Sequence, residues 1–279
     1  MLILPFRWYE QKYPKPRRKT LSEMKAYICV YLHPIPKDHD RRCSELAAAS
    51  NPTLRRFLDV YDDQNCCYDW GDDPSFFAAN QFFGDVRYAS WGVCRPDIRK
   101  SLKEGDYVVF FCAKSAEGPV REYFYIGVGT VSHKLTREII WSDEQYTKYQ
   151  DFFNILARLS KDELEHYETI SPFHDNWLER CKRPYWLFDH EQSQFNLFNP
   201  LHVATYTGTE GPFETWRSSE NQQIARLRAM LFPEKAPRQH LRINNRLSHR
   251  HINLRAQLGQ KASLHMLRSE LIELATISS

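Results

Sequence analysis

The chain has 279 residues, a formal net charge of +3 and an aromatic content of 14%, with seven tryptophans and fifteen tyrosines. This length can bury a substantial core, so we expect one main domain with an appendage. There is no run of about eighteen apolar residues and only a very short apolar start. We therefore expect neither a membrane span nor a secretion signal, and a cytoplasmic location. The cysteines form no C-x-x-C pair, which indicates reduced thiols and no metal site.

The first part of the chain indicates a basic arm followed by a mixed α+β domain. Residues 1–24 gather several cations around Pro14 and Pro16, as expected of an arm that precedes the domain. A strand is predicted at 27–32 and helical patches within 43–60. Asp73 followed by Pro74 is typical of a helix start.

The central stretch predicts a short helix followed by two strands. Pro96 and Asp97 suit the first turn of a helix, because proline gives up no needed amide there and a carboxylate complements the helix dipole. Gly105 ends that helix and Asp106 lies in the turn. Residues 107–112 and 123–131 are rich in aromatic and β-branched side chains, which is typical of strands packed on one core.

The last part of the chain changes from strands to helices. A helix is predicted within 145–159, and short strands at 185–188 and 202–206 would close a small barrel. From residue 219 the pattern is helical, and leucines repeat at three- and four-residue spacing at Leu264, Leu267, Leu271 and Leu274. This repeat predicts either packing on the domain or a seam for a homodimer. Segment 235–268 has Lys and Arg but no Asp or Glu, so we expect a cationic surface.

The order of residues in the central stretch resembles the EVE domains of the PUA-like superfamily. The residues that carry the likeness are Trp91, Gly92, Val93, Arg95, Arg99, Leu102, Gly105, Asp106, Phe110 and Phe111. The resemblance implies that residues 25–210 form a small mixed β-barrel of the PUA/EVE type surrounded by helices. Residues 218–279 would then be a basic α-helical extension. The chain is also similar to nucleotide-modification-associated domains found near DNA-modification and phage genes.

The same resemblance implies that Trp91, Val93 and Arg95 line a pocket for one nucleobase, often a modified one. A base must leave the stack to be read from all sides, and stacking on an aromatic ring returns about 1 to 3 kcal/mol. Further candidate walls of this pocket are Trp70, Trp141 and Trp186. A tryptophan is more often a residue of the core or its edge, and that alternative applies to each of them.

Arginines of the C-terminal tract are candidates for binding the phosphate backbone, because neutralised phosphates give salt-sensitive affinity that does not depend on sequence. The candidates are Arg242, Arg246, Arg250 and Arg255 of this tract, together with Arg99 of the central stretch. The alternative is a solvated helix face whose leucines pack on the domain. His249 and His251 fit polar surface residues better than metal ligands.

These patterns favour a binding protein over an enzyme. The sequence contains no G-x-S-x-G, P-loop, G-x-G-x-x-G or H-E-x-x-H motif, and no cofactor is expected. We expect a module that recognises a modified base flipped into an aromatic pocket, with DNA favoured over RNA and a link to DNA modification or phage defence. One alternative is a base-modifying enzyme that uses the same pocket, with Cys94 or Asp106 as the chemical group. Another is an interaction protein that dimerises through the leucine seam.

Overall fold

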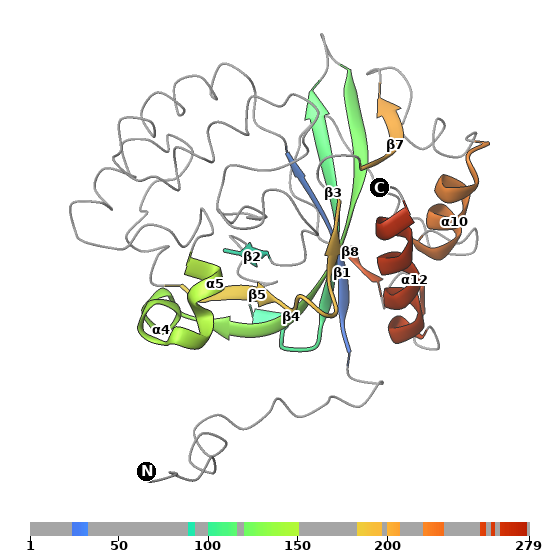
Figure 1. The fold of residues 1–279 in the computed structure, drawn as a ribbon. Coiled ribbons are helices and arrows are strands. Elements are labelled where there is room, and N and C mark those ends of the chain that lie inside the picture. Colours follow the sequence, from blue (N-terminus) through green and yellow to red (C-terminus); the bar gives the residue numbers. More distant parts are fainter. Residues whose placement is uncertain are drawn as a thin grey trace, which may run out of the picture.

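The computed structural model describes residues 24–32, 89–92, 100–115, 120–150, 183–196, 200–206, 220–231, 252–254, 258–259 and 263–277 (Figure 1). The strands are β1 (Ala26–Leu32), β2 (Ser90–Trp91), β3 (Tyr107–Ser115), β4 (Arg121–Leu135), β5 (Tyr185–Phe188), β6 (Gln194–Phe195), β7 (Leu201–Tyr206) and β8 (Ile252–Asn253). The helices are α4 (Arg137–Ser142), the 3-10 turn η1 (Glu144–Tyr146), α5 (Thr147–Gln150), α10 (Gln222–Leu231) and α12 (Leu264–Ile277).

The strands form one mixed sheet in the order β2-β5-β4-β3-β1-β8, and β6 and β7 also pair with β4. Strands β1 and β3 are parallel, with Ala26 opposite Tyr107, whereas β4 is antiparallel to each of its partners. β4 changes partner along its length, because its first half pairs with β7 and its last residues pair with β5. The predicted strands at 27–32, 107–112, 123–131, 185–188 and 202–206 are confirmed.

The α+β class is confirmed, and the sheet path is open within the described residues. Its two end strands, β2 and β8, do not pair with each other in this part of the chain. The register shifts in the β4–β7 pair between Tyr123 and Phe124 and in the β4–β5 pair between Val131 and His133, and irregularities of this kind favour a stronger local twist. The closed PUA-like barrel therefore stays a prediction.

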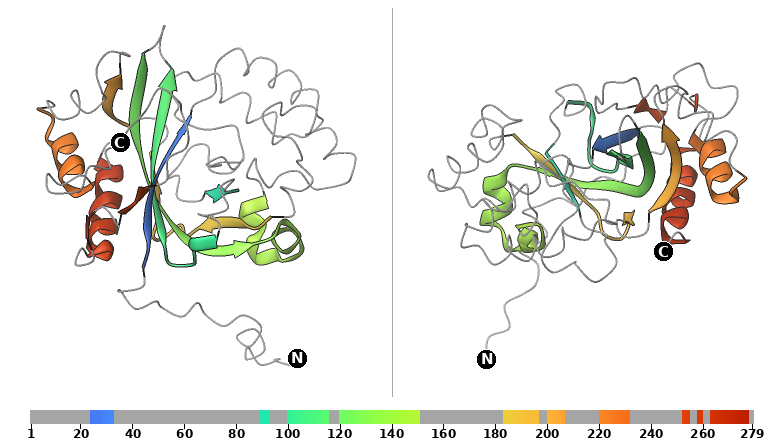
Figure 2. Two further views of the ribbon diagram at one scale, coloured as in Figure 1. Left: turned by 180° about the vertical axis from the view of Figure 1, so that it is seen from behind. Right: turned by 90° about the horizontal axis from the view of Figure 1, so that it is seen from above.

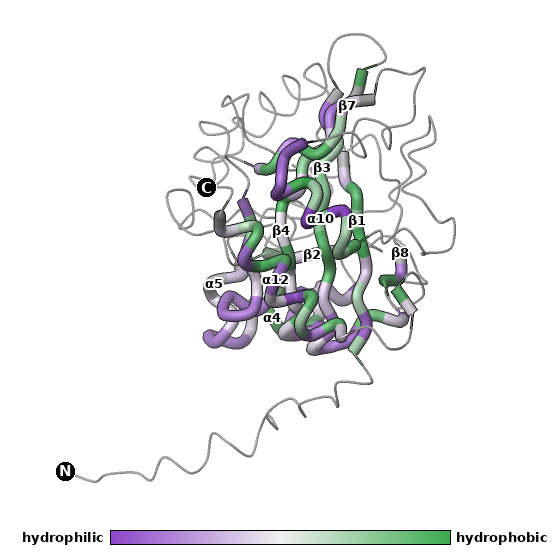
Figure 3. Tube along the Cα trace, turned by 90° about the vertical axis from the view of Figure 1, so that its right-hand side faces the viewer, coloured by the Kyte–Doolittle hydropathy of each residue, from purple (hydrophilic) through white to green (hydrophobic). Residues whose placement is uncertain are grey.

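Helices α10 and α12 cover one face of the sheet and share its core (Figures 1 and 2). The four leucines of the predicted seam, Leu264, Leu267, Leu271 and Leu274, are buried against sheet residues that include Tyr107, Val109 and Tyr125. Figure 3 shows the amphipathic colouring of α10 and α12 beside the apolar strands β1 and β3. The seam predicted for a homodimer is thus occupied by the chain's own sheet.

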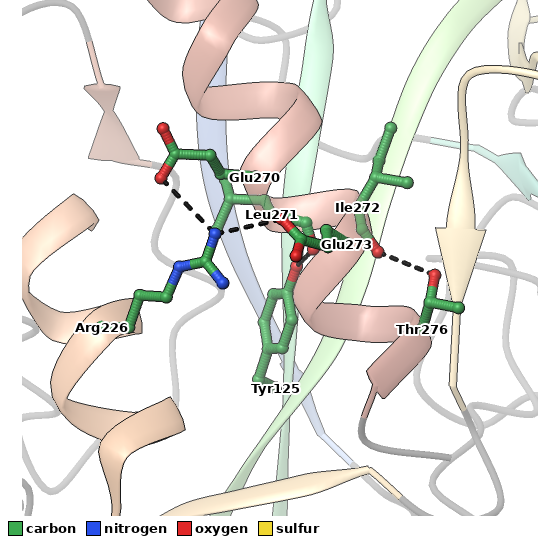
Figure 4. A network of polar contacts seen from close by, with 7 residues as sticks. All are labelled: Tyr125, Arg226, Glu270, Leu271, Ile272, Glu273 and Thr276. Atoms are coloured by element: carbon green, nitrogen blue, oxygen red, sulfur yellow. Dashed lines mark hydrogen bonds and ion pairs between the residues drawn. The ribbon is translucent and has the colours of Figure 1, made fainter.

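Polar contacts also join α10 and α12 to each other and to the sheet (Figure 4). The Tyr125 hydroxyl donates to the Leu271 carbonyl oxygen at 2.7 Å. Arg226 of α10 pairs with Glu273 at 3.1 Å and with Glu270 at 3.9 Å, in an exposed position where such pairs contribute little. Among the helices in the described ranges, none combines the length and the hydropathy that a membrane crossing needs.

Several predicted elements lie outside the described residues. They are all but the last residue of the basic arm of residues 1–24, the helical patches within 43–60, the helix that starts at Asp73, and most of the helix predicted within 145–159.

Candidate functional site

Two of the predicted pocket residues, Trp91 and Trp186, are neighbours on one face of the sheet. They lie opposite each other in the antiparallel pair of β2 and β5. Lys134 of β4 lies opposite Trp186 on its other side, so Trp91, Trp186 and Lys134 form one row across three strands. The row brings together residues from three separate parts of the chain.

Both indoles of this row are fully buried, with 0% exposure. Trp91 meets Phe110 edge-on with 5.5 Å between ring centroids, and Phe110 meets Phe188 in the same way at 5.5 Å. The Trp186 Nε1–H donates to the Leu102 carbonyl oxygen at 3.3 Å. Packing holds both rings and the hydrogen bond holds Trp186, so in this structure they are part of an aromatic core.

Lys134 connects this aromatic core to the surface. Its ammonium nitrogen lies 4.9 Å from the centroid of the Trp186 ring, and the side chain is exposed. Lys100 and Lys103 are also exposed, on the segment whose Leu102 carbonyl accepts the Trp186 hydrogen bond. We call Lys100, Lys103 and Lys134 the lysine patch, of which Lys134 places its positive charge at the Trp186 ring.

Trp141 lies on the opposite face of β5. It is partly buried on α4 and packs on a cluster that contains Tyr146, Tyr185 and Leu187. Tyr185 and Leu187 alternate with Trp186 along the strand, so their side chains point to the other side of the sheet. The structure therefore does not bring Trp141 to the row formed by Trp91 and Trp186.

Asp106 has a structural role in the described residues. Its side chain is fully buried, and its two carboxylate oxygens accept hydrogen bonds from the amides of Lys25 at 2.9 Å and Lys103 at 2.8 Å. These bonds tie the start of β1 to the turn before β3, in which Gly105 adopts a φ of 79°. Carboxylate oxygens held by two amides are poorly placed to read a base edge or to perform chemistry.

The remaining predicted site residues lie outside the described residues. They are Trp70, Val93 and Arg95 of the pocket, and Arg99, Arg242, Arg246, Arg250 and Arg255 of the backbone-binding group. Cys94, His249 and His251 lie outside as well. The nucleobase pocket and the binding of backbone phosphates by these arginines therefore stay predictions. Among the residues that are described, no three His, Cys, Asp or Glu side chains group in a way that could hold a metal ion.

Two cations near the sheet were not singled out from the sequence. Lys134 lies just past the predicted end of its strand, and nothing in the local pattern pairs it with a tryptophan. The charge pattern places Arg268 on the cationic surface, whereas in the structure it is 8% exposed and its guanidinium bonds to Thr130 of β4. Its spacing of four residues from Leu264 and three from Leu271 would have placed it on the apolar face of the helix.

Comparisons of the chain with protein-family models, with curated proteins and with solved structures found no match. The likeness to EVE domains therefore rests mainly on the residues between 91 and 111.

Proposed function

We propose that the chain is an EVE-like nucleic-acid-binding protein that recognises a modified base, with DNA as the favoured partner. The observation that carries the proposal is the position of Lys134, whose exposed ammonium group lies over the buried Trp186 ring. A cation at an aromatic ring offers phosphate neutralisation, and base stacking on the same ring requires that the buried indole be uncovered. A role in DNA modification or phage defence is part of the same proposal.

In the proposed mode of binding, Lys134 moves aside and a base stacks on the Trp186 ring. Its cation–π contact with Trp186 is worth about 0.5 to 2 kcal/mol. A base stacked on the same ring would return about 1 to 3 kcal/mol, and the displaced ammonium group could pair with a phosphate. This exchange is most favourable for a base that is already weakly stacked in its nucleic acid.

The C-terminal arginines add support from the sequence. Arg242, Arg246, Arg250 and Arg255 recur in a segment without acidic residues. A tract of this composition supplies affinity that does not depend on base identity, so the lysine patch would have to provide discrimination only.

A binding experiment with two matched lysine variants tests the proposal. Lys134→Gln removes the charge over Trp186, and Lys114→Gln removes a similar charge that lies 5.5 Å from the Phe124 ring at the opposite end of β4. Fluorescence anisotropy would compare single-stranded and duplex oligonucleotides with and without methylated or hydroxymethylated cytosine or methylated adenine, over a salt series. We expect Lys134→Gln to lose discrimination between bases and to reduce the salt slope by about 0.7 to 0.9, whereas Lys114→Gln binds like wild type.

Two outcomes would contradict the proposal. The first is equal loss in the two variants, because a general charge effect would not depend on Trp186. The second is failure of wild type to bind any oligonucleotide at low salt. Mass spectrometry of the nucleosides after incubation adds a check on reaction type, since a protein that only binds leaves them unchanged.

A further inference from the structure

Arg268 is a charged residue on the buried face of α12. It lies between Leu264 and Leu271 on the side of the helix that covers the sheet, and its exposure is 8%. Arginine is almost never this buried unless its charge is paired, because removing an ion from water is costly. The groups around this guanidinium therefore indicate what it binds.

The described protein groups use little of the Arg268 donor capacity. Its Nη1 donates to the Thr130 hydroxyl at the long distance of 3.5 Å, and within the described residues it forms no ion pair. A guanidinium has five N–H donors in a fixed planar arrangement. Burial lowers the Arg268 pKa, and Tyr107 and Asp189 act in the opposite direction by raising it.

Asp189 is the nearby carboxylate, and its own loop holds it. One oxygen accepts from the Glu191 amide at 2.8 Å and the other from the Gln192 side-chain amide at 3.3 Å. The first of these bonds is an Asx turn, which fixes the carboxylate in the loop between β5 and β6. Asp189 thus contributes negative potential at Arg268 without a contact to the guanidinium.

A second donor lies beside the same threonine. Ser193 is 3% exposed, and its oxygen accepts from the Thr130 amide at 2.9 Å. The Thr130 hydroxyl itself donates to the Gln192 carbonyl oxygen at 2.7 Å. The Ser193 O–H has no acceptor among the described residues, so both it and Arg268 offer donors around Thr130.

We propose that Arg268 and Ser193, held around Thr130, bind a small tetrahedral oxyanion of the phosphate type. The guanidinium belongs to α12 and the serine O–H to the loop between β5 and β6, and donors from separate elements suit a tetrahedral anion. Glu191 and Gln192 of the same loop are exposed, so the loop lies at the surface of the molecule. This site is independent of the nucleic-acid proposal, since it uses none of the residues of the lysine patch.

A stability titration with a matched arginine control tests the site. Thermal unfolding of the full chain would be followed in increasing inorganic phosphate, with chloride at the same ionic strength as the reference. Arg268→Met removes the buried guanidinium, whereas Arg226→Gln removes an exposed one that pairs with Glu270 and Glu273. We expect a phosphate-dependent rise in unfolding temperature for wild type and Arg226→Gln, and at least about tenfold weaker phosphate binding for Arg268→Met.

Several results would overturn the assignment. They are no phosphate effect beyond that of chloride in wild type, an undiminished effect in Arg268→Met, and an acetate effect equal to that of phosphate, which would exclude a tetrahedral preference. If Arg268→Met does not fold, Arg268→Lys keeps the charge but loses the planar set of donors. We then expect phosphate binding weakened severalfold, and unchanged binding in Arg268→Lys would likewise reject the site.

Discussion

Trp91 and Trp186 lie directly opposite each other across the pair of β2 and β5, and neither side chain is exposed. This pairing joins β2, the short strand at one end of the sheet, to β5 through two large apolar side chains. Removing either side chain should therefore lower the free energy of unfolding, whether or not the residue also takes part in ligand binding. A loss of binding in an alanine variant of either residue is interpretable only beside its stability.

We expect Trp91→Ala and Trp186→Ala each to lower the free energy of unfolding by about 3 to 5 kcal/mol, because each deletion leaves a large cavity. Trp141→Ala provides the control, since Trp141 is only partly buried on the other face of β5, and should cost about 1 to 2 kcal/mol. Urea denaturation followed by far-UV circular dichroism measures all three. Similar small losses in the three variants would show that the two opposed indoles are not core residues.

The buried carboxylate of Asp106 leads to a second prediction. Asp106→Asn weakens the hydrogen bonds from the Lys25 and Lys103 amides and places an amide donor against them, so we expect a loss of about 2 to 3 kcal/mol. Asp143→Asn is the matched control, because Asp143 accepts from the Gln145 amide near the surface and asparagine caps equally well. Chemical denaturation compares them, and a neutral Asp106→Asn would refute the structural role.

The strands could be predicted because β3 and β4 carry long runs of aromatic and β-branched residues, which suit a buried sheet whatever their partners. The extension of β4 to Leu135 could not be predicted from the sequence, because Ser132, His133 and Lys134 are polar and form a strand through pairing with β5. The parallel pairing of β1 with β3 also depends on distant contacts, including the Asp106 bond to Lys25.

For the site, the sequence named Trp91 and Trp186 separately, and only the pairing of β2 with β5 makes them neighbours. The position of Trp141 on the opposite face follows from the alternation within β5, which requires knowing that α4 packs against that face. Charge alone predicts a surface position for Arg268, whereas its helical spacing places it among the buried leucines. The helical spacing, and not the charge, therefore gives the correct burial of Arg268.

Glycine at position 127 is required by a close backbone approach. A side chain there would place its Cβ 2.0 Å from the Gln194 carbonyl oxygen of β6, and the residue has a φ of 142°. We expect Gly127→Ala to cost about 3 kcal/mol or more, because the backbone of β6 must move away. Gly259→Ala is the control that measures the cost of a positive φ without a steric clash, because Gly259 has a φ of 86° and open space around it. We expect it to lose only about 1 to 2 kcal/mol. Equal losses would contradict the steric argument.

Packing of α12 on the sheet leads to a prediction for the C-terminal helix. Leu271→Ala should destabilise the chain by about 2 to 5 kcal/mol, whereas Met266→Ala, at a position 64% exposed on the same helix, should change stability by about 0.5 kcal/mol or less. Thermal denaturation provides the comparison. Sedimentation of wild type and of Leu271→Ala adds a second test, because loss of a dimer in the variant would return the leucines to an intermolecular seam.

Tyr125 makes the stability of the fold decrease at alkaline pH. Burial, and to a smaller degree Tyr107, raise its pKa well above the ordinary tyrosine value of about 10. Below about pH 10 the folded and unfolded states both hold the proton, so the Leu271 hydrogen bond contributes fully. Above that pH the unfolded state loses the proton first, and stability falls by up to about 1.4 kcal/mol per pH unit until the folded pKa is reached. Urea midpoints at about pH 8, 10 and 11 should show the advantage of wild type over Tyr125→Phe shrinking with pH, and a constant difference would contradict the raised pKa.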